Sequence, residues 1–156
     1  MADATEAKGA SARPGSVSEP YRSYNFQIEI PGVGQGYFTN CSEIEMRVEA
    51  INYREGGTQQ IVRRLQGRVE HGEITLRGGV SDSEDLFTWL MNIAKGTIDR
   101  RTVNIIVLDT DGVAEKMRWQ LADAWPCAWR AKPLDALGRD IYIQELTLVY
   151  ESITRS

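Results

Sequence analysis

The sequence contains few of the residues from which catalytic and metal sites are usually built. Its 156 residues include only two cysteines, Cys41 and Cys127, and one histidine, His71. Two cysteines exclude a disulfide framework and a cysteine-rich zinc site, and one histidine leaves almost no basis for histidine-dependent metal or triad chemistry. We expect both thiols to be free in a protein that folds in a reducing cytosol, with a Cys41–Cys127 disulfide as the less favoured alternative.

Long apolar runs and an excess of positive charge are also missing. No segment approaches the roughly 18 apolar residues of a membrane span, and residues 1–20 lack the apolar core of a secretory signal. Lys and Arg total 18 against 22 Asp and Glu, and the resulting net charge of −4 argues against general nucleic-acid binding. The length predicts a single domain, which we place at residues 21–156 after a flexible tail over residues 1–20.

The hydrophobic pattern that is present is that of a mainly β protein. Residues 24–30 alternate between apolar and polar side chains, and residues 102–108 form a β-branched run. An Asp-Gly turn follows, and its partner strand is expected over residues 116–121. Residues 125–138 are predicted to be a loop. Residues 141–151 alternate with apolar side chains on both faces, which predicts a central strand.

A long hairpin is predicted over residues 42–65. Apolar residues first alternate with charged ones, and near Ile51 this alternation shifts by one residue. A shift of this kind indicates a bulge, or a strand that passes from one sheet to another. Gly56 and Gly57 form the turn, residues 60–65 return, and a further strand is expected over residues 69–77.

One helix is expected, over about residues 82–95. Ser81 with Glu84 three residues later has the spacing of a capping box, and Lys95 followed by Gly96 marks the end. Its apolar stripe consists of Leu86, Leu90, Ile93 and Ala94, flanked by Phe87 and Trp89. The stripe and Trp89 suit a helix that covers one opening of a β structure. The sequence therefore predicts a small antiparallel β-barrel or two-sheet sandwich of about seven strands with one α-helix.

Two segments resemble ligand-binding motifs: one is rich in glycine and the other begins with aspartate. Neither meets the requirements of the motif that it resembles. The glycines of residues 32–36 follow a strand, but no helix begins directly after them, as a dinucleotide fingerprint requires. A calcium loop starting at Asp109 needs Gly at position six and Glu at position twelve, where this sequence has Ala114 and Gln120. Both segments are therefore interpreted as turns.

Acidic, thiol and imidazole groups do not form a catalytic pattern either. The Glu residues of 43–49 share a strand face with Arg47, which is typical of a solvated surface and not of a glycosidase. Cys127 lies between tryptophans and is expected to be buried and inert, and His71 has no nucleophile motif to serve. We expect no catalytic, cofactor or metal site and predict that the protein is not an enzyme.

A set of short segments occurs in a particular order along the chain. They are YREGG at 53–57, LQG at 65–67, ITLRGGV at 74–80, Trp89, DRRTV at 99–103, WQLADAWP at 119–126, LDALG at 134–138 and ELTL at 145–148. In order and spacing they resemble the tail-tube protein family of contractile phages and phage-tail-like contractile injection systems. The resemblance covers residues 21–151 and departs at Gln66, where the family commonly has Pro.

The resemblance implies a structural role. Six copies would form a ring, rings would stack into a hollow tube inside a contractile sheath, and long hairpins would line a lumen that passes cargo or DNA. The implied partners are further copies of the chain, a sheath protein and baseplate or initiator proteins, with no cofactor, no specific nucleic-acid binding and no membrane anchor. Assembly would take place in the cytoplasm.

The resemblance also assigns roles to residues of the predicted hairpin. The side chains expected to face the lumen are Glu43, Glu45, Arg47 and Glu49. Those expected to face the core of the subunit are Ile44, Met46 and Val48. Ring stacking or subunit contact is expected at Arg54, Glu55, Gly56, Gly57, Arg63 and Arg64.

Two alternative functions remain open at this point. The first is a tube-initiator subunit of the same fold that makes a single ring at the baseplate, although the lack of an additional domain favours the repeating subunit. A ligand-binding β-barrel is the alternative from a different class, and it requires an apolar interior cavity. The sequence does not separate a phage tail from a domesticated injection particle.

Overall fold

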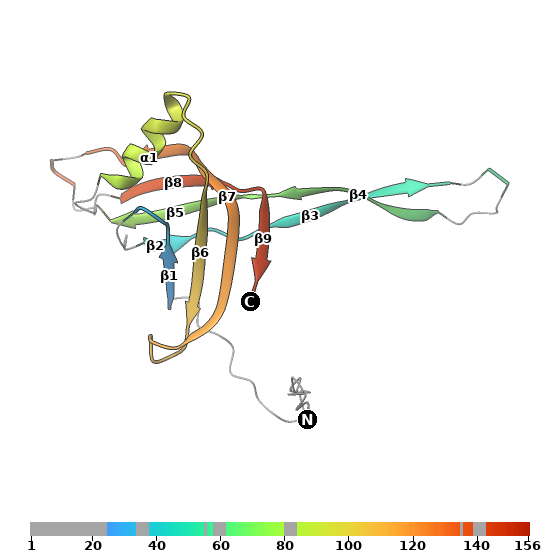
Figure 1. The fold of residues 1–156 in the computed structure, drawn as a ribbon, viewed down its shortest axis with the longest axis horizontal. Coiled ribbons are helices and arrows are strands. Elements are labelled where there is room, and N and C mark those ends of the chain that lie inside the picture. The colour runs from blue at the N-terminus through green and yellow to red at the C-terminus, as the bar shows by residue number, and fades with distance from the viewer. Residues whose placement is uncertain are drawn as a thin grey trace, which may run out of the picture.

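The computed structural model describes residues 25–33, 38–54, 56–57, 62–79, 84–134, 136–138 and 143–156. The predicted tail over residues 1–20 and the capping residue Ser81 lie outside these ranges. The elements within them (Figure 1) are β1 (Phe26–Glu29), β2 (Phe38–Cys41), β3 (Met46–Tyr53), β4 (Arg63–His71), β5 (Glu73–Gly79), α1 (Asp85–Ala94), β6 (Arg101–Leu108), β7 (Glu115–Ala131), β8 (Ile143–Val149) and β9 (Ser152–Arg155).

Two antiparallel sheets that share β7 make the body of the molecule. The first half of β7 pairs with β6 and β9, and the second half pairs with β8, which gives the strand order β1-β6-β7-β8-β5-β2. Among the described strands β1 and β2 do not pair, so the sheet stays open where a barrel would close. The expected mainly β, two-sheet architecture with one helix is confirmed, and β8 is central as predicted.

The predicted loop at residues 125–138 is wrong in its first half, because β7 continues through Trp125 to Ala131. Asp123 has a φ of 53°, and the β6–β7 register shifts beside it, so β7 bends from one sheet into the other at this residue. From Trp125 onward the described pairing of β7 is with β8 alone, and the register shifts again at Pro126. A proline is tolerated there because only one edge of the strand carries ladder hydrogen bonds.

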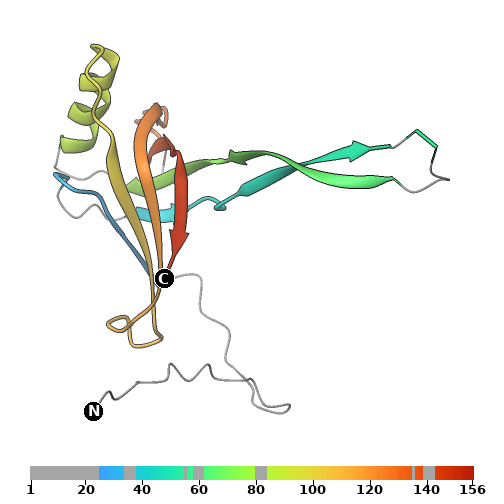
Figure 2. The same cartoon turned by 45° about the vertical axis from the view of Figure 1, so that its right-hand side comes forward.

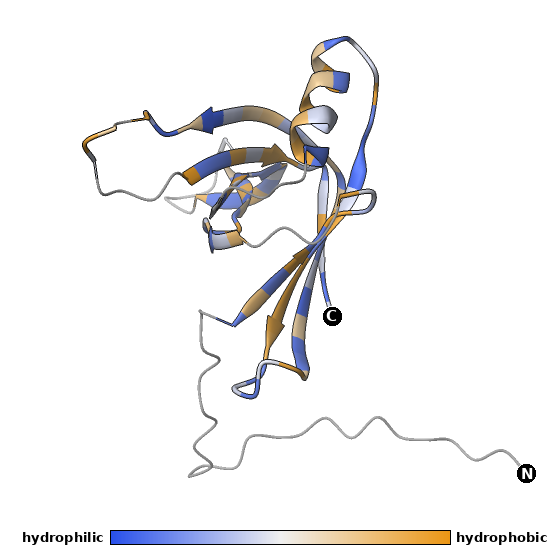
Figure 3. Ribbon diagram, turned by 90° about the vertical axis from the view of Figure 1, so that its left-hand side faces the viewer, coloured by the Kyte–Doolittle hydropathy of each residue, from blue (hydrophilic) through white to orange (hydrophobic). Residues whose placement is uncertain are grey.

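Side chains from both sheets and from α1 fill a single core, in which the alternation predicted from sequence is visible as orange and blue bands (Figure 3). The described buried residues that are fully inaccessible include Ile74, Leu76, Leu121, Leu148 and Trp89. Because Trp89 comes from the helix, α1 closes one end of the core as the apolar stripe predicted.

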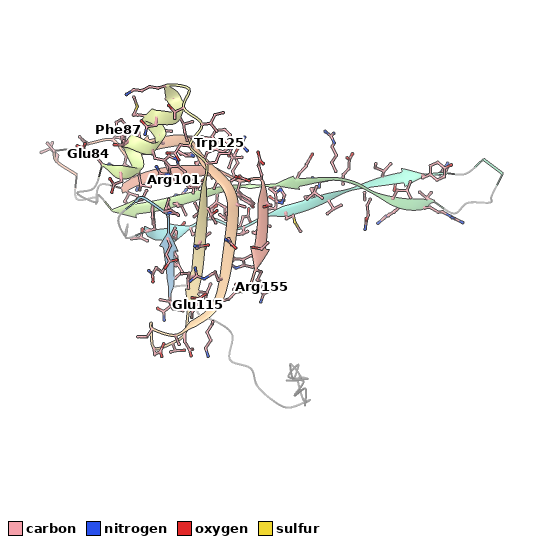
Figure 4. All side chains as sticks on the ribbon, viewed as in Figure 1. Glu84, Phe87, Arg101, Glu115, Trp125 and Arg155 are labelled. Carbon is pink, nitrogen blue, oxygen red and sulfur yellow. The ribbon has the colours of Figure 1, made fainter. Side chains whose placement is uncertain are left out.

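A polar cluster around Trp89 fixes this end of the body, where Figure 4 labels Arg101. The indole N–H of Trp89 donates a 2.9 Å hydrogen bond to the backbone oxygen of Asp99. The Arg101 guanidinium lies 4.9 Å from the Trp89 ring centroid and donates to both carboxylate oxygens of Asp99, at 3.1 and 2.7 Å. These hydrogen bonds hold the pKa of the Asp99 carboxyl below its usual range. The cluster therefore ties α1 to the start of β6.

The helix and two short strands differ in detail from the predictions. α1 begins at Asp85 and not at residue 82, and its N-cap residue Glu84 makes no side-chain cap hydrogen bond. The predicted capping box involves Ser81, which lies outside the described residues. Its end at Lys95 and Gly96 is confirmed, with Gly96 at a φ of 91°. β2 and β9, with four residues each, were not predicted.

Replacing Trp89 by Ala is expected to cost about 3–5 kcal/mol of unfolding free energy, the range found for large aromatic residues in cores. The matched control is Phe87→Ala on the same helix, since Phe87 is 46% exposed and meets Trp129 only edge to face at 5.5 Å between ring centroids. It should cost about 1 kcal/mol. Urea unfolding measures both, and equal losses would contradict the assignment of Trp89 to the core.

Candidate assembly surface

The hairpin formed by β3 and β4 stands away from the body as a separate two-stranded sheet (Figure 2). No described residue of either strand is buried. Each strand pairs only with the other within the described part of the chain, so the outer edge of each presents unpaired backbone N–H and C=O groups. The predicted long hairpin is confirmed, and its exposure makes it the candidate site.

The body holds the base of the hairpin through the backbone of Glu45. Its carbonyl oxygen accepts a 2.9 Å hydrogen bond from the Gly72 N–H and another of 2.9 Å from the Tyr150 hydroxyl. Tyr150 is a core residue, so the hairpin leaves the body from a fixed point. The return strand runs without a break from Arg63 to His71, which corrects the predicted division of this segment between residues 65 and 69.

A bulge interrupts the pairing near the middle of the hairpin. Val48 is opposite Val69 but Ala50 is opposite Gln66, so β4 contains one more residue than β3 at this place. Gly67 belongs to the bulge, and a Cβ on it would lie only 2.9 Å from the Cβ of Glu49. The bulge inferred from the phase shift near Ile51 is therefore confirmed. Bulges increase strand twist, and the two strands cross one another in Figures 1 and 2.

Apolar side chains of the hairpin are open to solvent at both ends of the ribbon. Near the body they are Met46, Val48 and Val69, with 57%, 45% and 54% of their surface exposed. Farther out they are Ile51, Tyr53 and Leu65, with 46%, 46% and 51% exposed. The expectation that Met46 and Val48 face the core is wrong, because β3 has already left the body when it reaches them. Ile44, which precedes β3, does pack against the core.

The structure places the two groups of predicted site residues at opposite ends of the hairpin. Glu43, Glu45, Arg47 and Glu49 are all exposed near the body, and the last three occupy alternate positions on one face. Arg54, Gly56, Gly57, Arg63 and Arg64 are exposed at the far end, with Gly57 at a φ of 111°, whereas Glu55 lies outside the described residues. Tyr53 lies eight positions after Glu45 along extended strand, a span of about 27 Å.

Charged groups of the hairpin make few contacts within the chain. The Arg68 Nε lies 4.0 Å from Glu49 Oε2, and both side chains are at least half exposed. Within the described ranges no ion pair involves Arg54, Arg63, Arg64, Glu43, Glu45 or Glu70. These charges are therefore available to another molecule.

The environments of Cys41, Cys127 and His71 do not activate these side chains for catalysis. Burial raises the pKa of Cys41 to about 11, and desolvation followed by the nearby Glu73 raises the pKa of Cys127. Cys127 is exposed and not buried as expected, but its thiolate is still disfavoured. Both cysteines are free. β8 and β5 separate their strands by about 14 Å, too far for a disulfide. The His71 ring packs edge to face on Tyr150, 5.5 Å away between centroids.

The described part of the chain contains neither a cluster of metal-binding side chains nor a helix that could cross a membrane. It contains no group of three or more His, Cys, Asp or Glu side chains arranged to hold a metal ion. None of its helices has the length and hydropathy needed to cross a bilayer. A hollow of about 230 Å³ lies beside the end of α1, lined in part by Ile93, Ile98 and Trp125, and it opens on the outside of the body.

Comparison with known proteins shows the family to which the chain belongs. The family model of the T4-like virus tail tube protein gp19 matches residues 22–154. The chain belongs to this tail tube family. The match covers the body and the hairpin together, and it places the chain in a structural family, as the resemblance predicted. No curated protein sequence matches the chain.

Solved structures agree with the family. A chain of the sheath–tube complex of an extracellular contractile injection system, PVC, in the extended state is 26% identical, with a TM-score of 0.79 over 90% of this chain and 93% of that one. A chain of the sheath/tube terminator of PVC is 25% identical, with a TM-score of 0.81 over 90% and 99%. Hcp1 from Flavobacterium johnsoniae, at 14% identity and a TM-score of 0.60 over 85% and 94%, shares the fold alone.

Removing the hairpin from this tail tube protein should leave the body folded. We expect replacement of residues 47–70 by Asn-Gly, which joins the paired residues Met46 and His71 by a tight turn, to change the unfolding free energy by no more than about 1 kcal/mol. The reason is that no described residue of the excised segment is buried. Circular dichroism and urea unfolding provide the measurement, and loss of cooperative unfolding would show that the hairpin belongs to the core.

Proposed function

We propose that this tail tube protein is the repeating subunit of the inner tube of a contractile injection system or phage tail. Six copies form a ring, and rings stack into a tube with a hollow lumen for cargo or DNA. The observation that carries the proposal is the hairpin of β3 and β4, which has two open edges and six exposed apolar side chains. An isolated two-stranded hairpin is only marginally stable in water, so neighbouring copies are needed to cover it.

Closure of the ring removes the open edges. In a ring each subunit presents the same surfaces to its two neighbours, and every hairpin can lie against the next one. Glu43, Glu45, Arg47 and Glu49 then face the lumen, and the carboxylates keep a polyanionic cargo from adhering to the wall. The exposure of these four side chains supports this assignment.

Stacking of the rings is assigned to the far end of the hairpin. Arg54, Glu55, Gly56, Gly57, Arg63 and Arg64 make the contact with the neighbouring ring. The guanidinium groups supply charge-assisted hydrogen bonds to acidic partners, and the two glycines allow the tight turn that exposes them.

The remaining partners follow from the tube. A contractile sheath surrounds it, and baseplate or initiator proteins start it, consistent with the sheath–tube structures that this chain resembles. Assembly takes place in the cytoplasm, with residues 21–156 as the ring-forming domain and residues 1–20 as a tail.

A single initiator ring at the baseplate is the second candidate. Its support is that a chain of the anti-feeding prophage baseplate, 23% identical, shares the fold with a TM-score of 0.76. The ligand-binding barrel has no such support, because Trp89 and the residues packed with it occupy the space between the sheets where a ligand would bind.

Reversing two charges at the far end of the hairpin tests the assignment of ring stacking to this end. Arg63→Glu with Arg64→Glu is expected to abolish stacking while rings and the folded subunit persist, because both side chains are exposed and contribute nothing to the core. Arg63→Lys with Arg64→Lys is the control that keeps the charge. Electron microscopy measures the outcome. Tubes of normal length from the reversed variant would show that this loop is not the stacking contact.

A further inference from the structure

The hollow beside the end of α1 is large enough for an apolar side chain and has apolar groups in its wall. It measures about 230 Å³ and is lined in part by Ile93, Ile98 and Trp125. An apolar cavity of about 150 Å³ already holds a benzene molecule, so this hollow accommodates the side chain of a leucine. Ile98 has 86% of its surface exposed, and a ligand in the hollow would remove part of that surface from water.

The charged residues that border the hollow are already paired within the chain. The Asp99 carboxylate accepts two hydrogen bonds from the Arg101 guanidinium. Arg100 forms an ion pair with Glu151. Because neither Asp99 nor Arg100 is left as an unpaired charge, the hollow favours a ligand without charge of its own.

The loop between β7 and β8 carries side chains of this kind. Leu134 and Leu137 have 84% and 96% of their surface exposed. Pro133 restricts the backbone directly before Leu134. The Lys132 N–H donates a 3.1 Å hydrogen bond to the backbone oxygen of Ile143, which holds the start of the loop on β8. Leu134 is therefore presented to the outside from a fixed base.

This loop cannot fill the hollow of its own chain. Trp125 lies in the wall of the hollow, and β7 continues from it in extended form to Ala131, about 20 Å away. In Figures 1 and 3 the chain leaves β7 on the left of the body, whereas the segment between α1 and β6 lies to the right of the helix. The loop and the hollow are thus two different surfaces on two sides of one subunit, as the contacts around a closed ring require.

Val113, in the turn between β6 and β7, is less suited to the hollow although it is 82% exposed. The Asp111 carboxylate accepts a 3.0 Å hydrogen bond from the Val113 N–H. Asp109 and Lys116 form an ion pair of 3.0 Å in the same turn. Docking of this turn would take these charged groups out of water, which is unfavourable, whereas Leu134 follows a proline and brings no charge of its own.

We propose that Leu134 of one copy docks into the hollow beside α1 of the neighbouring copy in the same ring. Its side chain packs against Ile98 and Trp125 of that neighbour. This inference rests on the proposed function, and it adds a contact between the bodies of adjacent subunits to the contacts made by their hairpins. Each copy gives its loop to one neighbour and receives the loop of the other.

The first test is a disulfide cross-link in the full-length chain. Leu134→Cys and Ile98→Cys are combined with Cys127→Ser, because Cys127 is exposed, whereas burial raises the pKa of the Cys41 thiol to about 11. After mild oxidation of assembled rings with copper phenanthroline, we expect a ladder of covalent oligomers up to six chains on a non-reducing gel. Each new cysteine alone should leave the chains unlinked.

The second test measures assembly without a cross-link. Leu134→Asp places a carboxylate in the apolar hollow, and we expect it to raise the concentration at which rings form by about tenfold or more. Val113→Asp is the matched control, an equally exposed side chain outside the contact, and should assemble like the original chain. Circular dichroism confirms that both variants are folded, and sedimentation velocity measures the rings.

The possible results separate this inference from the proposed function. If the original chain forms rings but the cysteine pair links no neighbours, links only within one chain, or Leu134→Asp assembles normally, the loop contact is wrong and the tube function stands. The same holds if a thiol reagent reaches Ile98→Cys in assembled rings and only added sheath protein blocks it, since the sheath is then the occupant. If the original chain forms no rings even with its cognate baseplate, the proposed function fails and this inference fails with it.

Discussion

The structure depends on a β-ribbon that is incomplete by itself. β3 and β4 satisfy each other along one edge and leave the backbone groups of the opposite edges without a strand partner among the described residues. Water can hydrogen-bond these groups in the monomer. Contact with water is unfavourable, however, for the six apolar side chains that the hairpin exposes. The hairpin therefore has more to gain from a neighbouring copy than any other part of the molecule.

The body has the opposite character, and this contrast explains how the subunit works. Its strands are paired through the shared strand β7, and Trp89, Asp99 and Arg101 lock the helix onto one end. Because the base of the hairpin is anchored through the backbone oxygen of Glu45 to Gly72 and to the core residue Tyr150, the hairpin projects from a fixed point in a fixed direction. In the proposed ring, the body holds the exposed hairpin in the same orientation in every copy. A closed ring requires identical surfaces of this kind on each subunit.

The sequence correctly predicted the positions of residues whose contacts are made within the same chain. Alternation located the strands of the body and the central place of β8, and Trp89 was correctly assigned to the space beneath the helix. It failed for Met46 and Val48, whose apolar character indicates a core although both side chains are exposed on the hairpin. It also failed at Pro126, where a proline normally marks a loop and only the tertiary structure shows a strand with one free edge. The sequence already places basic residues in the outer half of the hairpin and acidic residues in its inner half, and the structure shows that the described members of both groups are exposed.

Negative-stain electron microscopy of the purified full-length chain, with sedimentation to give the mass, tests the central claim most directly. The account predicts rings with a central hole, or stacks of such rings, formed by this chain alone or on its cognate baseplate. A population that stays at the 17.5 kDa of the single chain under both conditions would contradict it, because the exposed hairpin would then have no second copy to cover it.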